Sequence, residues 1–112
     1  MTGYDVIPLG PDRYGLVIGD TMGWDSHAAP VMANVREAVH ACAGADGANP
    51  GAVVGALDTL AAETGVGEMT TLIYVALDVH VGMLRLSNAG HCPPLVLDGN
   101  GDADRRVANE EP

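Results

Sequence analysis

The first twenty residues alternate apolar stretches with a polar turn, and this pattern predicts a β-hairpin. Residues 4–9 (YDVIPL) form the first apolar stretch and residues 14–20 (YGLVIGD) form the second, with GPDR between them. The proline and aspartate of GPDR suit a tight turn. Within the second strand, residues 15–19 are continuously apolar, which is typical of a strand that is buried on both faces.

Two amphipathic helices are predicted next, on either side of the glycines at residues 44–47. Their apolar residues recur at helical spacing, namely Val31, Val35, Ala38, Val39 and Cys42 in the first helix and Val53, Leu57, Leu60 and Ala61 in the second. Asp25 or Ser26 is placed to cap the first helix. Asn49 followed by Pro50 indicates a cap with proline at the first helical position, and a further pair of glycines ends the second helix.

The remaining chain predicts two more hairpins. Residues 70–79 are rich in β-forming side chains, and residues 82–90 alternate apolar with polar positions, so these segments pair around a short turn. Residues 95–98 and 105–108 flank GNGDAD and predict a last, weak hairpin. The order is therefore ββααββββ, which is typical of an α+β layer structure rather than a doubly wound parallel sheet.

Composition narrows the class of protein. A length of 112 residues suits one small domain, and a hydrophobic content of 47% excludes a disordered segment. Acidic residues outnumber basic ones by 15 to 5, and the resulting net charge of −10 excludes nucleic acid as a partner but suits divalent cations. No apolar run is long enough to cross a membrane, so we expect a soluble, cytoplasmic protein.

The two cysteines indicate neither a disulfide framework nor a metal motif, because they form no CxxC pair. Cys42 lies on the apolar face of the first predicted helix, where a small core residue is expected. Cys92 lies in a loop rich in glycine and proline.

Asp20 is the first candidate for chemistry, because it ends an apolar strand and precedes a turn. A carboxylate held at the end of a rigid strand suits Mg²⁺ or Mn²⁺, and the neighbouring backbone carbonyl adds a second oxygen ligand. The alternative is that Asp20 only caps the turn or the following helix. His91, in the loop SNAGHCPP, is the second candidate, and its alternative is a structural, hydrogen-bonded histidine.

Three segments together resemble a known family. GYDVIPLGPDRYGLVIGDTMGWDSHAAPVM, TTLIYVALD and LRLSNAGHCPPLVL are similar, in order and spacing, to the SpoIIE/RsbU-type branch of the PPM (type 2C) metal-dependent protein serine/threonine phosphatases. The resemblance implies a PPM-phosphatase-like β-sandwich with flanking helices and a dinuclear Mg²⁺ or Mn²⁺ site. It also implies hydrolysis of phosphoserine or phosphothreonine, with a phosphorylated STAS-type anti-anti-sigma protein as the partner.

The family motif G-D-x-x-G-H-G carries over unevenly onto this chain. Asp20 matches the metal-bridging aspartate, the backbone carbonyl that the family uses falls at Thr21, and Gly23 matches the next glycine. Trp24 and Asp25 replace the family's His-Gly pair. The resemblance thus implies Asp20 as the catalytic residue and a metal ligand, and Thr21 as a second ligand. Gly23, Asp25 and His91 are expected to line the site.

The first strand departs from the family pattern G-G-D-x-Y-D, whose first aspartate is a metal ligand. The usual spacing from Asp20 (20 − 18 = 2) leads to Thr2, whose neutral hydroxyl is a poor substitute for a carboxylate. Asp5 lies nearby as a further site-lining candidate, but side chains alternate along a strand, so it is expected on the other face.

The family's later acidic motifs are not found before Pro112, so we expect a single partial domain over residues 1–112 with the sandwich incomplete at the C-terminus. An uncovered sheet edge favours self-association into a homo-oligomer. Whether the chain is an enzyme stays open at this point. The alternatives are a metal-dependent phosphatase, a catalytically dead pseudo-phosphatase that acts as a regulatory binding module, and a truncated remnant.

Overall fold

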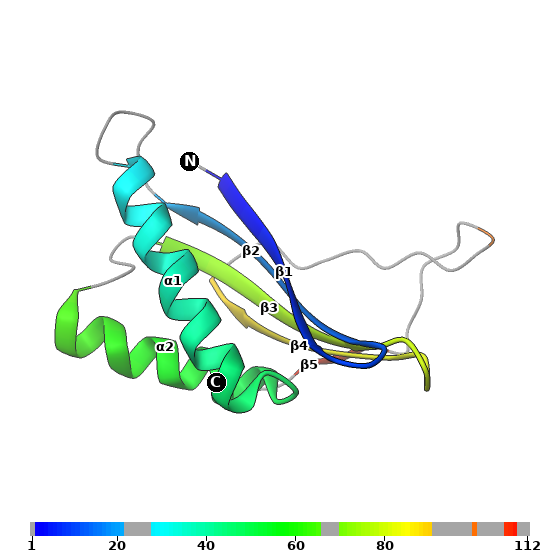
Figure 1. The fold of residues 1–112 in the computed structure, drawn as a ribbon. Coiled ribbons are helices and arrows are strands. Elements are labelled where there is room, and N and C mark those ends of the chain that lie inside the picture. The colour runs from blue at the N-terminus through cyan, green and yellow to red at the C-terminus, as the bar shows by residue number, and fades with distance from the viewer. Residues whose placement is uncertain (1, 22–27, 66–69, 91–99, 101–106, 110–112) are drawn as a thin grey trace.

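The computed structural model describes residues 2–21, 28–65, 70–90, 100 and 107–109. Its elements follow in the order ββααβββ (Figure 1). They are β1 (Thr2–Gly10), β2 (Arg13–Thr21), α1 (Ala28–Asp46), α2 (Pro50–Thr64), β3 (Thr70–Asp78), β4 (Met83–Ala89) and β5 (Val107–Asn109). The first two hairpins and both helices thus form where the hydrophobic pattern predicts them.

The strands make one sheet in the order β1-β2-β3-β4-β5. Neighbours from β1 to β4 are antiparallel, whereas β5 pairs in parallel with β4, with Val107 opposite Leu84. The prediction for residues 105–108 therefore needs correction, because the strand covers Val107–Asn109 and lies beside β4. Strand β4 is longer and already belongs to the sheet, so its backbone groups are in position to form hydrogen bonds with β5. Residues 95–98, the other arm of the predicted hairpin, lie outside the described residues.

Both helices pack against the same face of the sheet (Figure 1), and we call this the helix face. The strands and helices contribute equally to the core there, through Ile7, Val17, Leu72, Tyr74 and Ala76 from the sheet and Val35, Val39, Ala43, Val53 and Val54 from the helices. Cys42 packs against this core as predicted, and burial raises the pKa of its thiol. The predicted apolar faces of the helices are therefore the surfaces that the fold buries.

The connection between the helices differs slightly from the prediction. Helix α1 continues through the exposed Gly44 to Asp46. The break comes at Gly47, where a side chain would collide with Leu9 and whose carbonyl accepts a 2.7 Å hydrogen bond from the buried Tyr74 hydroxyl. A tertiary contact therefore decides where α1 stops.

Helix α2 begins and ends as the sequence predicts. Pro50 occupies the first turn, where its missing N–H costs no helical hydrogen bond, although the Asn49 side chain makes no capping bond. At the other end Gly65 adopts a left-handed conformation (φ 76°), and its N–H donates to the carbonyl of Ala61 at 2.8 Å. Glycine adopts this conformation without steric cost, which explains its place at the helix end.

The opposite side of the sheet, which we call the open face, carries no helix among the described residues. Strand β2 shows the contrast: Gly15, Val17 and Gly19 are buried on the helix face, whereas Ile18 on the open face is 38% exposed. The expectation that β2 is buried on both faces is therefore wrong for the described structure. Small glycines on the helix face, rather than double burial, explain its apolar sequence.

The open face is itself uneven. Tyr4 and Val6 on β1 are 73% and 52% exposed, whereas Ile73 on β3 and Leu86 on β4 are buried. Exposed apolar side chains therefore gather on the β1 and β2 side of this face.

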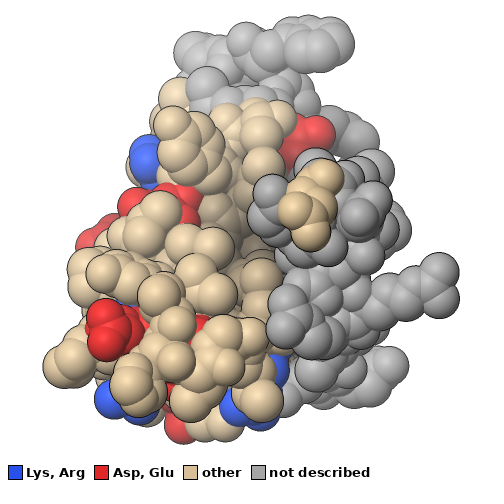
Figure 2. Space-filling model, turned by 90° about the vertical axis from the view of Figure 1, so that its right-hand side faces the viewer, with Lys and Arg blue, Asp and Glu red and all other residues tan. Residues whose placement is uncertain are grey.

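Charge is distributed rather than concentrated on the surface that Figure 2 shows. Acidic and basic side chains lie interspersed there, and most of the described surface in this view is uncharged.

Neither α1 nor α2, nor any other helical segment in the described ranges, has the length and hydropathy needed to span a bilayer.

Candidate active site

Asp20 lies near the end of β2 on the open face, with its side chain exposed. In the sheet register its two neighbours are Thr2 on β1 and Thr71 on β3. The Thr2 hydroxyl donates to Asp20 Oδ1 at 3.4 Å, a long and therefore weak hydrogen bond. We call Thr2, Asp20 and Thr71 the Asp20 corner.

The register places Thr2, the residue that the count of 18 aligns with the family's first aspartate, directly beside Asp20. Residues directly opposite in an antiparallel pair have Cβ atoms about 4.5–5.5 Å apart. Two carboxylates at these positions would therefore be close enough to share one cation. Thr2 offers instead a neutral oxygen at the place where the resemblance implies a second charge.

Thr21, the residue after Asp20, turns its side chain to the helix face. The side chain is 3% exposed, and its hydroxyl accepts a 3.0 Å hydrogen bond from the Thr70 hydroxyl. The side chain of Thr21 thus serves packing, and only its backbone carbonyl can act as the expected ligand. This division agrees with the alternation of side chains along a strand.

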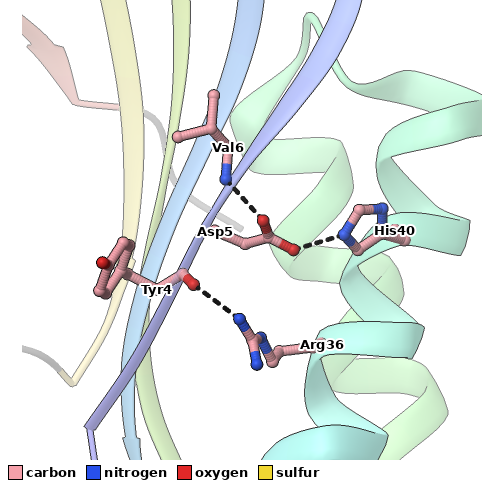
Figure 3. A network of polar contacts seen from close by, with 5 residues as sticks. All are labelled: Tyr4, Asp5, Val6, Arg36 and His40. Atoms are coloured by element: carbon pink, nitrogen blue, oxygen red, sulfur yellow. Dashed lines mark hydrogen bonds and ion pairs between the residues drawn. The ribbon is translucent and has the colours of Figure 1, made fainter.

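Asp5 lies on the helix face, as alternation along β1 predicts, and so does not join the Asp20 corner (Figure 3). Its Oδ2 is 2.6 Å from His40 Nε2 on α1, and its Oδ1 accepts a 2.8 Å hydrogen bond from the Val6 N–H. The hydrogen bond with His40, followed by that with Val6, holds the pKa of Asp5 below its usual value. Asp5 therefore links a strand to a helix.

The other site-lining candidates are Gly23, Asp25 and His91, and they lie outside the described residues. Their roles stay predictions. Sequence reasoning also missed Thr71, whose place beside Asp20 depends on the pairing of β2 with β3. Residues 70 and 71 are both threonine, so the sequence alone does not say which one shares a face with Asp20.

The Asp20 corner presents oxygen atoms, which suit Mg²⁺ or Mn²⁺. Its charge is low, because Asp20 is its only carboxylate and the described ranges contain no group of three histidine, cysteine, aspartate or glutamate side chains able to hold a metal. These residues fit one weakly held divalent cation with water completing its shell. They do not fit the pair of cations that the resemblance implies.

Two comparisons relate this chain to known proteins. Residues 10–112 match the family model of stage II sporulation protein E (SpoIIE). The structure is similar to the crystal structure of the RsbU and RsbW domains of Rv1364c from Mycobacterium tuberculosis, with a TM-score of 0.79 and 30% identity. That match covers 92% of this chain and 29% of the Mycobacterium chain, so this chain spans less than a third of that protein.

The match confirms the predicted α+β class and the phosphatase-like fold of the RsbU type, of which the described residues form a single sheet with its two helices. The chain belongs to the SpoIIE family.

Proposed function

We propose that this chain is a SpoIIE-type protein phosphatase domain that hydrolyses phosphoserine or phosphothreonine on a regulatory protein. The observation that carries the proposal is the exposed carboxylate of Asp20 on the open face, in a chain of this family and fold. The substrate class that we infer is a phosphorylated STAS-type anti-anti-sigma protein of a partner-switching pathway. The similar Mycobacterium chain, which contains RsbU and RsbW domains, supports this kind of pathway.

In this proposal Asp20 and the backbone carbonyl of Thr21 hold Mg²⁺ or Mn²⁺. A bound cation supplies neutralisation of the phosphoryl charge and a more acidic water. The protein's contribution is to hold the Asp20 carboxylate on a rigid strand, flanked by the hydroxyl-bearing Thr2 and Thr71. Because one carboxylate does not fit two cations, we assign no step of hydrolysis to a metal pair.

A second candidate is a non-catalytic member of the family that binds a regulatory partner. Thr2 favours it, since the hydroxyl beside Asp20 brings no negative charge to balance a dication. The two candidates share a fold and a binding partner, and they differ in whether the Asp20 corner holds a cation tightly enough for hydrolysis.

The experiment is Mn²⁺-dependent hydrolysis of p-nitrophenyl phosphate by the purified chain, compared with Asp20→Asn and Asp5→Asn. Each variant removes one carboxylate, and the two carboxylates lie on neighbouring strands. Asp20 is on the open face, whereas Asp5 is on the helix face. For an enzyme we expect Asp20→Asn to lower the rate by roughly 100-fold or more, since even outer-shell changes cost 10- to 100-fold. The Asp5→Asn variant should retain most of the wild-type rate of hydrolysis.

Each outcome selects one candidate. Activity that requires both Mn²⁺ and Asp20 supports the phosphatase. No hydrolysis by a chain that circular dichroism shows to be folded supports the binding module. Activity that survives Asp20→Asn would show that the assignment of Asp20 is wrong.

A further inference from the structure

Among the strands that the structure describes, β1 lies at an edge of the sheet, with β2 as its neighbour on one side. An edge strand offers unpaired N–H and C=O groups to any added strand, and a nine-residue edge is long enough to accept one. In an antiparallel pair the backbone groups of alternate residues point away from the neighbouring strand. Whether these outward N–H and C=O groups already have hydrogen-bond partners decides whether the edge can accept another strand.

Two outward groups of β1 are already occupied (Figure 3). The carbonyl of Tyr4 accepts a 3.2 Å hydrogen bond from Arg36 Nη2, and the N–H of Val6 donates to Asp5 Oδ1 at 2.8 Å. Tyr4 and Val6 are two residues apart, so their groups point to the same side of the strand. Pro8, two residues further on, has no N–H to offer.

Helix α1 holds these contacts in place. Arg36 and His40 are four residues apart and therefore lie on one side of the helix, which faces β1 in Figure 3. His40 Nε2 is 2.6 Å from Asp5 Oδ2 and so fixes the carboxylate that covers Val6. The helix is anchored in turn by the buried Val35 and Val39. We call Asp5, Arg36 and His40 the edge guard.

The two occupied groups are those that a second copy of this chain would need. If two β1 strands paired antiparallel around a twofold axis at Asp5, Val6 of one copy would lie opposite Tyr4 of the other. The Val6 N–H would then donate to the Tyr4 carbonyl across the axis, twice. The exposed side chains of Tyr4 and Val6 would also meet on the open face, which favours this pairing.

We propose that the edge guard keeps β1 from pairing with β1 of a second copy, and that its removal converts this chain into a β1–β1 dimer. Asp5 acts twice, because it covers the Val6 N–H and because two carboxylates would stand face to face at the axis, which disfavours pairing. In the structure α1 and Asp5 occupy the Tyr4 and Val6 groups of the β1 edge.

The test is sedimentation velocity over a range of concentrations with the double variant Asp5→Ala/Arg36→Ala. Glu63→Ala/Arg13→Ala is the matched control, since it makes the same change in charge on α2 and β2, outside the edge guard. We expect the wild type and the control to stay monomeric, whereas the double variant approaches twice the monomer mass as concentration rises. Adding Val6→Pro to the double variant should restore the monomer, because proline removes the bridging N–H.

The proposal would be overturned by a double variant that is folded and monomeric, by a dimer that persists after Val6→Pro, or by a wild type that already pairs through β1. If the double variant does not fold, Asp5→Ala alone decides the question. This variant uncovers the Val6 N–H and removes the two facing carboxylates, and the exposed Arg36 side chain is free to turn away from the Tyr4 carbonyl when a second copy approaches. Dimerisation of this variant at higher concentration supports the proposal, and a monomer at every concentration overturns it.

Discussion

The two faces of the sheet both carry tyrosine and aspartate, but these residues have different surroundings on each face. On the helix face Tyr74 is fully buried and Asp5 is fixed by His40, whereas on the open face Tyr4 is 73% exposed and Asp20 is exposed. Position along a strand, rather than residue type, separates a structural acid from a candidate functional one. The comparison teaches that the face of the sheet on which an aspartate lies must be known before the aspartate is assigned a role in the site.

The largest expected difference between the faces concerns their tyrosines. Tyr74→Ala should lower the free energy of unfolding by about 3–5 kcal/mol, because it leaves a cavity and removes the hydrogen bond to Gly47. Tyr4→Ala should change it by less than about 0.5 kcal/mol, as for other exposed positions. Urea unfolding of both variants measures the difference, and equal losses would show that the open face is as well packed as the helix face.

Alkaline pH should destabilise the protein through Tyr74 on the helix face. Burial raises the pKa of Tyr74 to about 12, above the 10.0 of a free tyrosine. The protein therefore keeps this contribution to stability below pH 10 and loses it as pH rises toward 12, because the unfolded state releases the proton more readily. Unfolding titrations from pH 9 to 12 should show the loss in the wild type.

The matched control for this titration is Tyr74→Phe, which has no titrating hydroxyl. This variant starts less stable, since the Gly47 carbonyl loses its donor, but its stability should depend less on pH over the same range. A pH dependence identical to that of the wild type would assign the alkaline loss to another group.

On the open face, Thr2→Asp sharpens the assignment of Asp20. A second carboxylate in register with Asp20 should raise Mn²⁺ affinity by about tenfold or more, because it supplies a second charged oxygen. Without metal the same variant should unfold more easily, since like charges stand opposite each other. Titration of Mn²⁺ followed by electron paramagnetic resonance measures the affinity without any need for catalysis.

Thr2→Asn has the same shape as Thr2→Asp but no charge, and it should leave Mn²⁺ affinity near that of the wild type. If Thr2→Asp binds Mn²⁺ no better than Thr2→Asn, the Asp20 corner is not a cation site.

The smallest expected effect is that of Asp5→Asn on stability. The pKa of Asp5 lies below 3.8 in the folded protein, so its carboxylate stabilises the fold above that pH and loses the contribution as pH falls through the lower, folded value. At pH 7 the variant should lose less than about 1 kcal/mol, as is typical of exposed pairs. Unfolding at pH 7 and at pH 3 measures whether the loss disappears in acid.

Much of the fold follows from the sequence. The helical period predicts which faces of α1 and α2 are buried, as Val35, Val39 and Val53 illustrate. The glycine after α2 and the proline at its start also predict its ends. These features depend on neighbours within one or two turns, and a linear pattern therefore contains them.

The sequence predicts less well wherever distant segments meet. Continuous apolarity in β2 does not distinguish double burial from a strand whose helix face is lined with glycine. Gly15 is small because the Tyr74 hydroxyl lies where its side chain would be, and that contact joins β2 to β3. The place of β5 beside β4 likewise depends on pairing, which local pattern does not specify.

The sequence by itself determined the local conformations, the α+β class and the candidacy of Asp20, because periods of 2 and 3.6 and the spacing of motifs are properties of the chain. Only the tertiary structure decided that Thr2 and Thr71 flank Asp20 and that Asp5 turns to His40. It also decided that Arg36 covers the β1 edge. These contacts join residues 18 to 51 positions apart, and strand register and helix packing, rather than local preference, bring them together.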